Sequence, residues 1–578
     1  MQKVKKIIYV IVIAVNVFIY SSGYPAEVYY LGQQESRSSQ INPSYSLSQR
    51  IKDILDLSSE RDYAERSGRL SGSFSQEINW QSVSGNKSKS FLEEGTDYLS
   101  ELNLNLQEKL MRDYNFEGQW FLRKTDNRRI ETKKDVRLKQ LNLKVFNPKN
   151  IFEFGDFYAD FSPFVLGSSL EGFNIKISPS EIRDYHFIVA RKYREDTATE
   201  RFQRNAFGFK IDQYLFKDSD LFSNFRLGFQ SVSIQDDSST AYDNGNAKDL
   251  RNNVFSFDGE FSLTKYLSFQ YEVARSTYLE DEDSETIKDT KYGTALRLQP
   301  AINLDKISLR YLYYYGQPKF YTDLGSASTD KIQHQISLDY RLNEKATVNV
   351  VENYYWDHLS GSSLTKRTTN DEKYLSFNFR PFEKFKDLTL RPYINYQEKD
   401  SDDGINSAES TTKTFGFGIN DVLNEKTSYG LGYEYRAYID EGNDKANSDY
   451  FHRLNFNFSH EQSFCSKRLY YTFSPNLELR DTKSEDDNDI NLGLSFNGQY
   501  DISKNTILRF GHNLQDTNSA RAGADFLNNC SFLESDSTLY NNRNTHFIFR
   551  VERNRYDHED GSQEYRENRI IAKFLTNF

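Results

Sequence analysis

The sequence predicts an all-β protein: one antiparallel up-and-down barrel that spans a membrane, with about 26 strands and a range of roughly 22 to 28. Three observations predict this fold. Apolar and polar residues alternate over much of the chain, short and long connections alternate between these segments, and aromatic residues are abundant although mean hydropathy is low.

The alternation is clearest between Thr414 and Arg436. Phe415, Phe417 and Ile419 alternate with small or polar residues, and after a polar turn at 424–426 the same pattern returns from Tyr429 to Tyr435. Strand side chains point to opposite faces with a period of two. This segment is therefore a predicted hairpin with one apolar face, which we expect to contact lipid, and one polar face.

The connections between predicted strands follow a second pattern. Short turns at 264–265, 342–346 and 501–505 alternate with longer polar loops at 235–252, 317–330 and 439–449. Membrane barrels have short periplasmic turns and longer extracellular loops. A soluble β-sandwich has no reason to keep this order.

The composition excludes several classes of protein. Mean hydropathy is −0.76, and no apolar run after the N-terminus approaches the ~20 residues of a membrane helix. An aromatic content of 15% argues against disorder. The net charge of −11 argues against nucleic acid as a partner.

The N-terminus has the features of an export signal. Lys3, Lys5 and Lys6 precede the apolar run 7–20, and Ser21 to Gly23 supply small residues for cleavage. Residues 1–23 are therefore a predicted signal peptide, with an uncleaved anchor as the alternative. Residues 24–68 are a predicted periplasmic segment, either a short helix or plug or a loosely ordered N-terminus. Residues 69–578 form the predicted barrel.

The first predicted strands are 70–80, 102–110, 114–122 and 136–146, the last with a bulge near Leu141 where the pattern changes phase. An even strand number requires one more strand between 515 and 542. We expect it at 531–539, followed by a turn at 540–543.

The last strand carries a resemblance. Ile570, Ala572, Phe574 and Phe578 lie on one face of 569–578, and the chain ends on an aromatic residue. This resembles the C-terminal strand of large bacterial outer-membrane β-barrel proteins, porin-like or exporter-like. The resemblance implies a Gram-negative outer membrane, contact with lipid and lipopolysaccharide, and Phe574 and Phe578 as a signal to the barrel-assembly machinery. The residues that carry this resemblance indicate no narrower family.

One segment, 152–173, is aromatic where an extracellular loop is expected. It could fold into the lumen as a constriction formed by Phe161, Phe164 and Leu166, because a long apolar loop exposed to water is costly. The simpler alternative is two ordinary strands joined by a tight Ser-Pro turn, with its aromatic residues at the membrane interface.

The polar face supplies the other candidate residues. By alternation, we expect the following to face the lumen: Asp339, Arg341, Ser428, Glu434 and Arg436. Arg191 to Arg204 form a basic cluster with interspersed acidic residues, which favours a neutralised loop. The alternative is that some of these side chains face the lumen and favour anionic solutes. Acidic runs in the loops favour solvated segments over cation sites.

No spacing in the sequence predicts a catalytic group, a metal site or a cofactor. Cys465 and Cys530 are expected to be isolated thiols, although a disulfide is the alternative.

The sequence favours a channel that passes a solute or an exported polymer. A barrel of this size has a wide interior, so we expect loops, the N-terminal segment or a periplasmic export partner to gate it. The alternatives are a structural or adhesion barrel without transport, and a secreted soluble β-protein.

Overall fold

The computed structural model describes residues 68–578 apart from these segments: 111–112, 132–133, 194–202, 217–222, 238–249, 281–289, 360–366, 384, 386, 403–406, 442–446, 484–487, 520–523, 540–543, 560 and 562. The predicted signal peptide and residues 24–67 lie outside the described residues.

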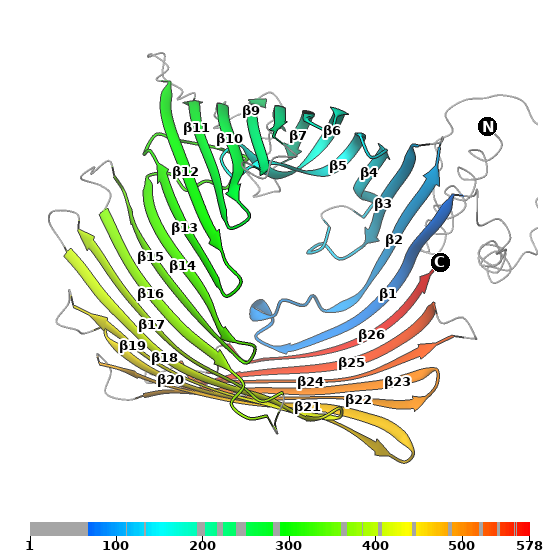
Figure 1. Ribbon diagram of the computed structural model, residues 1–578. Helices are drawn as coiled ribbons and strands as arrows, with labels where there is room; N and C mark the ends of the chain where they lie inside the picture. Colours follow the sequence, from blue (N-terminus) through cyan, green and yellow to red (C-terminus); the bar gives the residue numbers. More distant parts are fainter. Residues whose placement is uncertain are drawn as a thin grey trace, which may run out of the picture.

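The described residues form one sheet of 26 antiparallel strands, each bonded to the next in sequence, and the sheet curls into a ring (Figure 1). The strands are β1 (Arg69–Gly85), β2 (Gly95–Lys109), β3 (Asn115–Thr125), β4 (Arg137–Phe146), β5 (Asn150–Ser162), β6 (Leu166–Ser180), β7 (Arg183–Tyr193), β8 (Gln203–Leu215), β9 (Ser223–Asp237), β10 (Leu250–Thr264), β11 (Leu267–Glu280), β12 (Lys291–Asn303), β13 (Ile307–Gly316), β14 (Lys331–Asn343), β15 (Ala346–Asp357), β16 (Arg367–Phe379), β17 (Thr389–Asp402), β18 (Ser407–Asn424), β19 (Thr427–Asp440), β20 (Asp449–Phe464), β21 (Lys467–Thr482), β22 (Asn488–Ser503), β23 (Thr506–Asn518), β24 (Phe526–Thr538), β25 (Thr545–His558) and β26 (Tyr565–Asn577).

The first and last strands close the ring. β1 pairs with β26 from Ser73 opposite Asn577 to Gly85 opposite Tyr565, so each strand in the described part of the chain has two neighbours and none is left as an edge. A 3₁₀ turn, η2 (Lys87–Lys89), follows β1. Within the part of the chain that the structure describes, no helix is long and apolar enough to span a membrane.

The two faces of the sheet differ in chemistry. One face exposes large apolar side chains on strand after strand, including Ile78, Trp80, Phe255, Phe257 and Ile394. Their strand neighbours on the other face are polar or small, as with Glu77 and Asn79 on β1. Exposed apolar patches of this extent mark a surface that contacts lipid. The predicted alternating barrel is therefore confirmed, with 26 strands and the apolar face outward.

The connections confirm the expected alternation. Two-residue turns join β10 to β11, β14 to β15 and β18 to β19, whereas longer connections such as 317–330 lie at the opposite end of the strands. The register shifts where Phe121 and Leu122 face Gln140 and Leu138, so the bulge predicted near Leu141 is present. The expected inward strand before residue 540 is β24.

The C-terminal residue belongs to the closing seam. The backbone nitrogen of Phe578 donates to the Gly72 carbonyl over 3.0 Å, and the Gly72 nitrogen donates to the Phe578 carbonyl over 2.9 Å. The Phe578 ring packs with Phe74 and Trp120 around buried Leu102 and Leu104. A side chain at position 72 would lie 2.3 Å from the Asn103 carbonyl oxygen, so the close packing here requires glycine.

Candidate functional site on the inner face of the barrel

The β5–β6 hairpin leaves the wall and folds across other strands. Its tip, residues 159–170, holds Phe164 and Leu166 at 0% exposure and Phe161 at 5%. The Phe161 ring leaves no room for a side chain at Gly208 of β8, where a Cβ would lie 3.1 Å from it, and the Phe164 ring packs edge-on against Tyr314 of β13. A short hairpin reaches from β8 to β13 on the concave side of a closed ring, and Figure 1 shows β5 inside the wall.

A glycine permits the departure from the wall. Gly155 has a φ of 102°, and a Cβ there would lie 2.0 Å from the Leu141 carbonyl oxygen. Positive φ is accessible to glycine at little cost. The β4–β5 pairing ends at Gly155, while β5 and β6 remain paired out to Ser162 and Leu166. The hairpin therefore bends as a unit.

The connection 317–330 between β13 and β14 covers the hairpin tip. Phe320 and Leu324 are 1% and 2% exposed. The Gly167 nitrogen donates to the Leu324 carbonyl over 2.8 Å, and the Ser326 nitrogen donates to the Pro163 carbonyl over 2.9 Å. We call the hairpin tip 159–170 and the connection 317–330 together the inner plug. Its apolar core packs on small inward residues of the wall, such as Ala206, Val232, Val254, Ala274 and Ala295.

A buried ion group fixes the inner plug to the wall. The Arg204 guanidinium on β8 binds the Asp236 carboxylate on β9 over 2.5 Å and also binds Asp323 of the plug. The three side chains are 4%, 1% and 7% exposed. The Glu272 carboxylate of β11 accepts hydrogen bonds from Ser162 of the hairpin tip and, over 2.8 Å, from Ser256.

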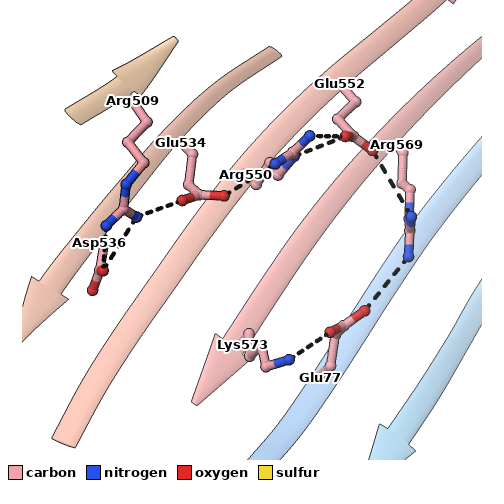
Figure 2. Close-up of polar contacts among 8 residues, drawn as sticks. All are labelled: Glu77, Arg509, Glu534, Asp536, Arg550, Glu552, Arg569 and Lys573. Atoms are coloured by element: carbon pink, nitrogen blue, oxygen red, sulfur yellow. Dashed lines mark hydrogen bonds and ion pairs between the residues drawn. The ribbon is translucent and has the colours of Figure 1, made fainter. Parts of the chain in front are cut away.

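The seam carries a second charged group, shown in Figure 2. Arg509 binds Glu534 over 2.7 Å, Arg550 binds Glu534 over 3.2 Å, and the Arg550 Nε donates to Glu552 over 2.7 Å. Arg569 then bridges Glu552 at 3.8 Å and Glu77 at 3.5 Å. Asp536 and Lys573 complete the row at its two ends. These eight residues, which we call the seam ladder, balance four positive charges with four negative ones across β23 to β1.

The five residues expected in the lumen all lie on the face that carries the seam ladder and the inner plug. Tyr393 donates to Glu434 over 2.5 Å, and the Arg436 guanidinium lies 4.8 Å from the centre of the Phe451 ring. Ser428 bonds Ser459 over 2.8 Å. Asn349 donates to Asp339 over 2.8 Å, and Arg341 donates to the Asp305 carbonyl in the β12–β13 turn. A role of these residues in transport stays a prediction.

The hairpin tip differs from the simpler expectation for 152–173. The two strands and the Ser-Pro turn are present, but Phe161, Phe164 and Leu166 are buried against the inner wall and not placed at the membrane interface. Their role as a constriction stays a prediction. Contact of these residues with 317–330 was not predicted from the sequence, although Phe320 and Leu324 are large apolar residues in a mostly polar loop. Arg204, assigned to a loop, lies in β8.

In the described part of the chain, the cysteines and the possible metal ligands form no site. Cys465 and Cys530 are free, the former exposed in the β20–β21 turn. Among the residues with a described position, no group of three or more His, Cys, Asp or Glu side chains could hold a metal ion.

These features together decide the fold class. The chain is a large β-barrel of the outer-membrane type. A scan against protein-family models and a search of curated proteins both found no match.

Several solved structures are similar to this chain. The siderophore receptor PirA from Pseudomonas aeruginosa is 13% identical, with 89% of this chain and 81% of that chain covered and a TM-score of 0.42. The ferric enterobactin receptor PfeA from the same organism is 9% identical, with 89% and 82% covered and a TM-score of 0.44. The P pilus usher PapC translocation pore is 9% identical, with 88% and 99% covered and a TM-score of 0.34. At this level the likeness carries no argument about function.

Proposed function

We propose that this protein is an outer-membrane channel whose passage runs through the barrel lumen and is narrowed by the inner plug. The main support for the proposal is the difference in chemistry between the outer and inner faces of one closed ring. The outer face is apolar, whereas the inner face carries charged and amide side chains over most of its circumference.

The inner plug supports a gated passage over a permanently open one. It is held by a small apolar core and by Arg204, and both attachments join segments that are separate in the sequence. Segments of this kind open locally at a lower cost than the paired wall. The wall would therefore stay intact while the plug moves.

The proposed setting follows from the same features. The predicted signal peptide exports the chain, lipid and lipopolysaccharide surround the apolar band, and the assembly machinery recognises the last strand through Phe574 and Phe578. A periplasmic export partner would dock at the end with the short turns.

Single-channel recording tests the proposal. The refolded chain lacking residues 1–23 is compared in planar bilayers with a variant in which 159–168 is replaced by a four-residue glycine-serine turn. The expected result is a small conductance that rises in the variant. A silent wild type with a silent variant would contradict a channel, and equal conductances would contradict a constriction by the hairpin tip.

A further inference from the structure

The inner face opposite the plug carries a lateral row of uncharged residues. Residues that pair directly across neighbouring strands share one face, and from β18 to β24 the pairings join Gly418, Gly432, Asn455, Asn476, Gly493, Gln515 and Asn528. The next residues on this face form a parallel row: Asn420, Gly430, Asn457, Ser474, Ser495, Asn513 and Cys530. We call the two rows the amide track.

The amide track is hollowed. One hollow of about 480 Å³ is lined from Gly418 to Asn476, and a second of about 390 Å³ is lined from Ser474 to Cys530. Both are lined by Ser474 and Asn476, so they form one continuous groove across the strands. Glycine makes the floor: a Cβ on Gly432 would meet nothing within 4 Å, whereas one on Gly493 would lie 1.7 Å from the Asn476 Oδ1.

The amides of the track have unused hydrogen-bonding capacity. Among the described residues, the side chains of Asn455, Asn457 and Asn476 form no hydrogen bond within the protein. The Asn528 Oδ1 is buried and has no partner. Each carboxamide offers two donors and an acceptor, so the groove presents both kinds of group repeatedly to whatever occupies it.

The size and charge of the groove narrow the class of ligand. Strands lie about 4.8 Å apart, so the span from β18 to β24 is roughly 29 Å, longer than a single small molecule. The two rows of the track carry no charge. In the row beside them, Arg453 binds Glu478 over 3.0 Å and Tyr393 donates to Glu434 over 2.5 Å. Glu478 also lines the second hollow. An elongated, uncharged ligand with alternating donors and acceptors fits these features.

We infer that the amide track binds a linear, uncharged polyhydroxylated chain, an oligosaccharide segment, as it passes along the inner wall. This inference rests on the proposed channel function and specifies what the channel carries. Hydroxyl groups donate and accept, so they match carboxamides in both directions. Anionic chains are disfavoured because the residues that line the two hollows include no Lys or Arg, and the charged residue among them, Glu478, is an anion. Arg391, which pairs with Gly418 at the β18 end of the track, donates to the Tyr374 hydroxyl over 3.5 Å.

Binding is measured apart from transport. Isothermal titration of the detergent-solubilised barrel with maltohexaose gives the affinity, and current block by the same sugar in planar bilayers gives passage. Polyethylene glycol of equal hydrodynamic size, which accepts but does not donate along its length, is the ligand control. The test variant is Asn455→Leu with Asn476→Leu. The matched control is Asn105→Leu, an exposed asparagine on the inner face of β2 outside the track.

The expected result is saturable binding of maltohexaose that weakens about tenfold or more in the double variant, since two or more hydrogen bonds are lost. The Asn105→Leu barrel should bind like the wild type, and polyethylene glycol should not compete. Absent binding, or equal binding by the double variant, overturns the amide track even if the barrel conducts. Saturable binding by a barrel that never conducts overturns the channel and leaves the track standing.

Discussion

Replacing Arg204 by methionine should release connection 317–330 from the wall while leaving the barrel closed. Methionine keeps much of the side-chain volume and removes the cation that joins Asp236 of β9 to Asp323 of the plug. Two buried carboxylates then face each other without that cation. Asp323 lies in a connection and not in a strand, so it can move into water without breaking strand pairing. We expect this movement to remove the repulsion between the two carboxylates.

The magnitude follows from the burial of the three side chains, none more than 7% exposed. Removing one partner from a buried ion group costs about 3–5 kcal/mol. Phe320 and Leu324 hold the connection with about 1.5–3 kcal/mol each. The free energy lost is therefore about as large as that of the apolar attachment, and the equilibrium constant for opening should rise by roughly a hundredfold to a few thousandfold.

Trypsin cleavage after Lys319, which lies in this connection and is exposed, reports the opening. When opening is fast, the cleavage rate follows the population of the open form. Heat-modifiable migration in gels shows that the barrel itself remains folded. The triple variant Arg204→Met, Asp236→Leu, Asp323→Leu should restore protection, because an apolar replacement of the whole group leaves no buried charge. Cleavage of Arg204→Met at the wild-type rate would refute this account of how the plug is held.

Three further outcomes are expected. Gly293→Val should expel the same connection and raise conductance, because a Cβ there would lie 2.0 Å from the Phe320 nitrogen; unchanged current would contradict the close packing. Phe164→Ala should destabilise the hairpin tip by about 3–5 kcal/mol and increase current noise without changing gel migration. Arg569→Ala should lower the temperature at which the barrel unfolds in gels, because Arg569 binds Glu552 and Glu77 across the seam, whereas Arg310→Ala, an exposed pair with Asp339, should not.

The wall could be predicted from the sequence because its pattern is local. Outward residues such as Phe415 and Tyr433 repeat every second position, and lipid contact imposes that period on each strand. The inner plug could not be predicted in this way. Phe164 meets Phe320 and Tyr314 more than a hundred residues away, so neither segment shows the contact by itself. The bend at Gly155 also has no local signal beyond the glycine.

The amide track depends on register, which a single sequence leaves undetermined. Asn455, Asn476 and Gly493 are ordinary strand residues until the pairings place them side by side. A slip of one residue in any pair would turn one member of the row toward lipid. Charged neighbours such as Glu434 were easier to recognise, because a charge inside a membrane barrel has only the lumen to face.

The seam sets the order of assembly. Glu77 and Arg569, which meet there, are separated by 492 residues, whereas all other strand pairs join consecutive segments. Contacts of such separation form late, because the loop that they close must be ordered first. Until β26 reaches β1, the sheet is an open ribbon with two unpaired edges that can pair with other chains. The step just before closure is therefore the slowest in folding and the one that leaves the most backbone unpaired. Helper proteins would protect the barrel most by covering those two edges.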